Sequence, residues 1–155
     1  MQLHSLIIRP DFTVSSATGE EQLLVEVKNW TPAPAKAINQ RRIAIEQRQI
    51  FDHPECYFLL ATPNQMALWL PVENGQYTMT SAYKVDPTLV LANYLTIERH
   101  PLRALTEQDF SLVISSWLGS VIFKPAQILL EMPAQAWLVE SGLHERIYRG
   151  YIHRE

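Results

Sequence analysis

Two carboxylates and a lysine near the start of the chain are the residues most suited to chemistry. Asp11 follows Pro10, and Glu26 is separated from Lys28 by one residue, with fourteen residues between Asp11 and Glu26. Carboxylate oxygens are the hard ligands that Mg²⁺ prefers, and waters or a substrate phosphate commonly complete its coordination. A neighbouring ammonium can orient or deprotonate an attacking water and neutralise charge on phosphoryl oxygens. These residue types therefore predict metal-assisted hydrolysis if they lie together.

Two extended segments have to position these three side chains. Residues 6–14 are rich in β-forming residues, residues 15–20 are a turn-type cluster, and residues 23–28 are again strand-like. Side chains alternate along a strand, so Glu26 and Lys28 share one face with Leu24. If the two strands are antiparallel neighbours, Asp11 stands beside Glu26.

Helical and strand patterns alternate along the rest of the chain. Residues 35–51 carry mostly helix formers and should end by Pro54, because the residue before a proline disfavours the helical region. A continuous apolar run predicts a buried strand over 56–61, and a turn then leads to a second strand over 66–70. Further helices are expected over 88–99, over 110–119 after an N-cap at Thr106, and over 134–141, ended by Gly142. The pattern is that of an α/β protein.

Composition indicates a single globular domain over residues 1–155. The chain is 47% hydrophobic and 19% charged, with a net charge of -3, which argues against a protein that coats nucleic acid or anionic membranes through its overall field. Its apolar runs are shorter than the about 20 residues that a bilayer span needs. The first residues lack the basic start and cleavage site of a signal peptide, so we expect a cytoplasmic protein without a membrane partner. Cys56, the single cysteine, is read as a small buried hydrophobe.

The order strand, Pro-Asp, turn, strand, Glu-x-Lys and helix resembles the core of the PD-(D/E)XK superfamily, which has the restriction-endonuclease-like fold. Residues 57–63 and the Leu-Trp pair at 68–69 look like the next two strands of an uncharacterised bacterial branch, so the resemblance covers residues 6–70. It implies a mixed central sheet of four to five strands flanked by helices. A mostly helical part over 87–155 would cover the sheet or form the surface of a homodimer.

The resemblance implies cleavage of phosphodiester bonds in nucleic acid, with Mg²⁺, or Mn²⁺, as the metal. DNA is the favoured partner, and RNA stays open as a substrate. Asp11 and Glu26 would hold the metal and Lys28 would act on the water. The predicted helix over 35–51 carries a set of basic residues that are candidates for contacts to backbone phosphates: Lys36, Arg41, Arg42 and Arg48. A solvated helix face is the alternative explanation for these four residues.

One departure from the superfamily pattern leaves other interpretations open. Members commonly have an N-terminal helix that contributes a further acid, whereas the ten residues before Asp11 include no acidic one. A metal ligand would then be missing, and the chain could be a catalytically inactive binding or assembly module on the same fold. In a third interpretation, Asp11, Glu26 and Lys28 are outward-facing charges on a solvated hairpin.

Overall fold

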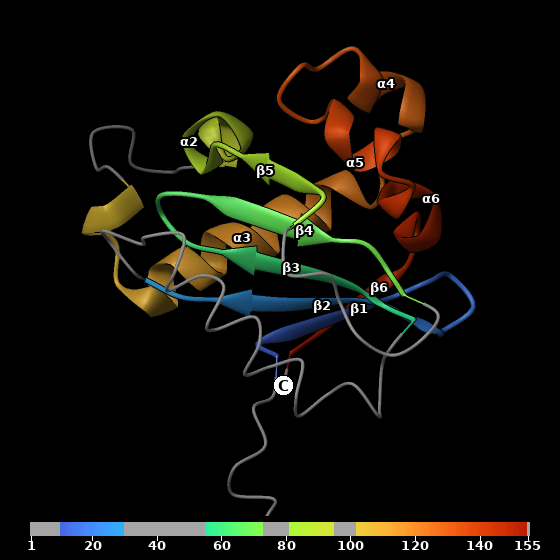
Figure 1. Ribbon diagram of the computed structural model, residues 1–155, viewed down its shortest axis with the longest axis horizontal. Coiled ribbons are helices and arrows are strands. Elements are labelled where there is room, and N and C mark those ends of the chain that lie inside the picture. The colour runs from blue at the N-terminus through green and yellow to red at the C-terminus, as the bar shows by residue number, and fades with distance from the viewer. Residues whose placement is uncertain (1–9, 30–54, 73–80, 95–101, 155) are drawn as a thin grey trace, which may run out of the picture.

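A mixed β-sheet organises the protein. The computed structural model describes residues 10–29, 55–72, 81–94 and 102–154. These residues form a six-stranded sheet in the order β5-β4-β3-β2-β1-β6 (Figure 1). Its strands are β1 (Phe12–Ser15), β2 (Glu21–Val27), β3 (Tyr57–Ala61), β4 (Met66–Trp69), β5 (Tyr83–Val85) and β6 (Tyr151–Arg154). Strand β2 pairs with β3 in parallel, and the other neighbouring strands are antiparallel. The expected α/β class is confirmed.

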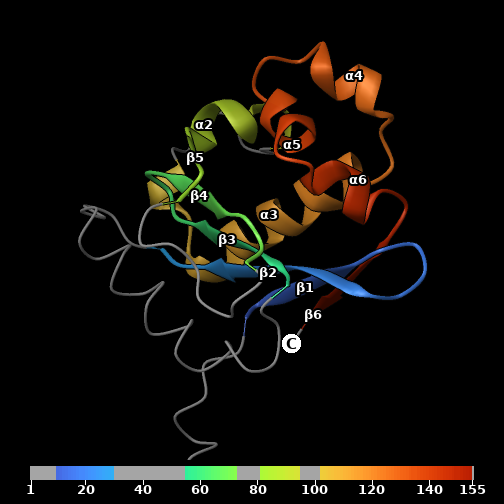
Figure 2. The same cartoon turned by 45° about the vertical axis from the view of Figure 1, so that its right-hand side comes forward.

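The helices of the described residues lie mostly in the C-terminal part. They are α2 (Pro87–Val90), α3 (Glu107–Val121), α4 (Ala126–Leu130), α5 (Ala136–Glu140) and α6 (Leu143–Ile147), with 3-10 turns η2 (Ala92–Tyr94) and η3 (Leu102–Ala104). The predicted N-cap of α3 is confirmed, because the hydroxyl of Thr106 accepts a 3.0 Å hydrogen bond from the backbone N–H of Asp109. Helix α3 crosses one face of the sheet, and α4, α5 and α6 gather beside it (Figure 2).

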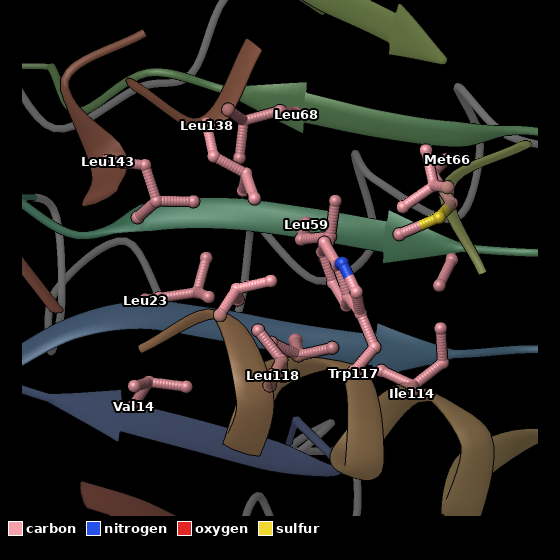
Figure 3. Packing of buried hydrophobic residues seen from close by; sticks show 14 of the residues in the cluster. Val14, Leu23, Leu59, Met66, Leu68, Ile114, Trp117, Leu118, Leu138 and Leu143 are labelled. Carbon is pink, nitrogen blue, oxygen red and sulfur yellow. The ribbon is translucent and has the colours of Figure 1, made fainter. Parts of the chain in front are cut away.

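The larger core lies between α3 and the sheet. Val14, Leu23 and Leu59 point from three neighbouring strands toward Trp117 and Leu118 of α3, and all five are fully buried (Figure 3). Alternation along the strands puts every second residue on this face. Helix α3 is thereby fixed against the part of the sheet that contains β1 and β2.

A smaller core occupies the opposite face of the sheet. Its members are Leu24, Cys56, Phe58, Leu60, Ala67 and Trp69. The prediction that residues 56–60 are buried on both faces is confirmed, since Leu59 and Leu60 are each 0% exposed and belong to different cores. Burial raises the pKa of the Cys56 thiol to about 12, so this thiol stays neutral at ordinary pH.

The sheet is wider than the four to five strands expected. The additional strands are β5, in a stretch that reads as polar, and β6, at the end of the part expected to be mostly helical. Strand β6 pairs with β1, and Gly150 directly before it approaches the backbone oxygen of Ser15 too closely for a side chain. The predicted helix over 88–99 is not continuous in its described part, because α2 ends at Val90 and the 3-10 turn η2 follows, and residues 95–99 lie outside the described residues.

Other expectations concern residues outside this description. The predicted helix over 35–51 lies outside the described residues, as does most of the predicted strand before Asp11. Within residues 10–29, 55–72, 81–94 and 102–154, no helix is long and apolar enough to cross a membrane.

Candidate functional site

Asp11 lies at the end of the hydrogen-bonded pairing between β1 and β2 and bonds to β2. Its backbone N–H donates to the carbonyl of Val25 at 2.8 Å, and its Oδ2 accepts from the backbone N–H of Val27 at 2.7 Å. The carboxylate thus supplies an acceptor at the point where the main-chain pairing stops. The bond fixes the carboxylate beside the residue that separates Glu26 from Lys28.

Glu26 and Lys28 form an ion pair at the C-terminal end of β2. The Nζ of Lys28 lies 3.3 Å from Oε2 of Glu26. Glu26 is 1% exposed and lies next to Leu60 in the parallel register, on the face of the smaller core. Removing a carboxylate from water is costly unless a cation or hydrogen bonds compensate it. The ammonium of Lys28 provides part of that compensation.

A third carboxylate comes from α3. Glu107 is the first residue of this helix, and its Oε2 lies 4.0 Å from Nζ of Lys28. Its Oε1 accepts from the backbone N–H of Asn29 at 3.1 Å, and the Asn29 side chain donates to the carbonyl of Leu105 at 2.8 Å. These bonds tie the chain just after Lys28 to the start of α3. The Lys28 ammonium therefore lies between one carboxylate from β2 and one from α3.

Sequence reasoning missed Glu107 as a site residue. The segment around Thr106 is recognisable as a helix start, and an acid in the first turn is common because it complements the helix dipole. Nothing local to this segment indicates that α3 begins beside β2. The contact depends on the packing of α3 across the sheet, which joins residues 78 positions apart.

A pocket of about 230 Å³ opens beside Asp11. Its lining combines two acids, one base, two neutral polar side chains and one apolar side chain: Asp11, Glu107, Arg154, Gln108, Ser111 and Val27. Arg154 comes from β6, where it pairs in register with Phe12, and its guanidinium carbon lies 5.4 Å from the centre of the Phe12 ring. Strand β6, which the sequence did not indicate, therefore brings a cation to the same pocket as Asp11.

The structure describes three of the seven candidate residues predicted from the sequence. Asp11, Glu26 and Lys28 all lie where β2 ends and β1 begins. The candidate phosphate contacts all lie outside the described residues: Lys36, Arg41, Arg42 and Arg48. Among the residues that the structure describes, no group of three or more His, Cys, Asp or Glu side chains is placed to hold one metal ion.

The ion pair predicts a non-additive effect on stability. Lys28→Met should lower the free energy of unfolding by about 2 to 3 kcal/mol, because it removes a cation from a buried carboxylate. The double variant with Glu26→Gln should recover much of that loss, because neither charge remains. Urea unfolding of both variants measures the difference. Lys84→Met, at an exposed lysine of β5, is the control and should stay within about 0.5 kcal/mol of wild type. A double variant no more stable than Lys28→Met would contradict the coupling.

No family model, curated protein or solved structure matches this chain. Its function is therefore inferred from the side chains gathered at the end of β2.

Proposed function

We propose that this protein is a metal-dependent phosphodiesterase that cleaves nucleic acid, with the end of β2 as its active site. The observation that supports this most is the position of the Lys28 ammonium, 3.3 Å from a carboxylate oxygen of Glu26 and 4.0 Å from one of Glu107. Asp11 is bound to the residue between Glu26 and Lys28 and lines a pocket together with Glu107. Two of these acids, Asp11 and Glu107, line the pocket, and Glu107 also contacts the Lys28 ammonium.

The donor set fits Mg²⁺ chemically. Mg²⁺ is usually held by one or two carboxylates plus waters and substrate phosphates, so a site without three protein ligands is compatible with it. Asp11 and Glu26 would hold the ion, and Mn²⁺ has the same preference for oxygen ligands. When bound, the metal would supply charge stabilisation and lower the pKa of a coordinated water.

Lys28 and Glu107 have distinct roles in this proposal. Lys28 places a positive charge where negative charge grows on the phosphoryl oxygens during hydrolysis, and it orients the attacking water. Glu107 acts through Lys28 and Asn29, because its two oxygens contact the ammonium of one and the backbone N–H of the other. Glu107 is therefore a positioning residue, which α3 supplies.

A non-catalytic binding or assembly module on the same fold is the second candidate. The observation that favours it is that the polar groups of the trio already have partners within the protein. Asp11 accepts a backbone N–H, and Lys28 is paired with Glu26. Such contacts stabilise a strand end even without any substrate.

A cleavage assay distinguishes the two candidates. The purified protein is incubated with supercoiled, linear and branched DNA and with RNA, in Mg²⁺ or Mn²⁺, and in parallel with EDTA. The phosphodiesterase should cut at least one of these substrates in the presence of metal and none in EDTA. Binding without cuts in any substrate would contradict the proposal and support the binding module.

A further inference from the structure

Arg154 lines the pocket beside the proposed active site. It is the last residue of β6 and lies opposite Phe12, the residue after Asp11. Its guanidinium lies over the Phe12 ring, which is 1% exposed and part of the core under α3. The attraction between the guanidinium and this ring favours positions of Arg154 beside Phe12.

No ion pair joins Arg154 to the described acids that line its pocket. Asp11 and Glu107 line the same pocket, yet among the described residues Arg154 forms no ion pair within 4.0 Å. A guanidinium that contacts an aromatic ring without an ion-pair partner can still donate N–H groups to an oxyanion. Gln108 and Ser111 add neutral hydrogen-bond donors to the same lining.

We propose that Arg154 binds a phosphate of the nucleic-acid backbone in the pocket beside Asp11. This inference rests on the proposed function and adds to it the group that holds the substrate chain. Contacts to phosphates position the protein on nucleic acid and carry no base identity. Arg154 therefore contributes affinity to every sequence equally, and Asp11 and Glu107 line the same pocket.

Salt-dependent binding of Arg154→Gln tests the proposal. Fluorescence anisotropy with three labelled duplex DNAs of different sequence, in Ca²⁺ to limit cleavage, gives the affinity at several salt concentrations. Loss of one phosphate contact should make the negative slope of log K against log salt shallower by about 0.9 for duplex DNA. Binding should weaken several-fold and to the same extent for all three sequences.

Two further variants and a stability measurement complete the test. Lys84→Gln removes the same charge from exposed Lys84 of β5, at the opposite edge of the sheet, and should leave slope and affinity unchanged. Arg154→Lys keeps the charge but loses the planar fork, so it should retain the slope and lose part of the affinity. Arg154 is exposed, so thermal unfolding of Arg154→Gln should match wild type.

The outcomes separate this inference from the proposed function. An unchanged slope in Arg154→Gln, an equal change in Lys84→Gln, or a loss confined to one sequence would overturn the phosphate contact. Absence of wild-type binding to all three duplexes would overturn it as well. A shallower salt dependence in Arg154→Gln, together with no cleavage by wild type in any assay, would support the phosphate contact and overturn only the proposed phosphodiesterase activity.

Discussion

Asp11→Asn should lower metal-dependent cleavage by about 10²- to 10⁴-fold while leaving the fold in place. The amide oxygen of asparagine can still accept the hydrogen bond from the backbone N–H of Val27, so the end of the β1–β2 ladder is preserved. The negative charge that would hold the metal is lost. Metal ions commonly supply several kcal/mol of charge stabilisation in the transition state, and each 1.36 kcal/mol corresponds to about tenfold in rate.

Asp86→Asn is the matched control for this substitution. Asp86 caps α2 by accepting the backbone N–H of Thr88 at 2.9 Å, so the same chemical change is made at a similar hydrogen bond after β5, away from β1. Thermal unfolding should show that both variants are folded. Initial cleavage rates should fall in Asp11→Asn and stay at the wild-type level in Asp86→Asn. Wild-type cleavage by Asp11→Asn would remove Asp11 from the site, and an unfolded Asp11→Asn would show that its charge is needed for the fold.

Local patterns in the sequence were sufficient to predict the strands and the helix start around Glu26 and Lys28. The unbroken apolar run after residue 55 has no polar side to face water, and this gave β3 as a doubly buried strand. Alternation placed Glu26 and Lys28 on one face, as their 3.3 Å contact now shows. Thr106 was recognisable as a cap because its side chain satisfies a backbone donor three residues later.

The remaining parts of the site depend on pairing that no local pattern carries. Strand β6 has three exposed residues out of four and is a strand because it pairs with β1. Glu107 reaches the pocket because α3 packs across the sheet, and Arg154 reaches it because β6 pairs with β1. An acid in a first helical turn and an arginine near the end of a chain are common on solvated surfaces, so their residue types alone indicated no site.

Leu59→Ala and Leu60→Ala should each lower the free energy of unfolding by about 2 to 5 kcal/mol, and by similar amounts. Both side chains are 0% exposed, but Leu59 belongs to the core under α3 and Leu60 to the core on the opposite face. Truncating a buried leucine removes apolar contacts and leaves a cavity, whichever face it occupies. Urea unfolding measures both, and Leu89→Ala, at a side chain that is 64% exposed, should change stability by no more than about 0.5 kcal/mol.

The comparison between these two variants bears directly on the proposed active site. Leu60 lies next to Glu26 in the register of β2 and β3, on the same face of the sheet. A cost for Leu60→Ala as large as that for Leu59→Ala would mean that this face is covered as firmly as the face under α3. Glu26 would then be held in a dry environment, where its pairing with Lys28 is strong and its carboxylate is fixed. A cost below about 1 kcal/mol for Leu60→Ala would instead mean that water reaches this face, and Glu26 would be an ordinary surface carboxylate.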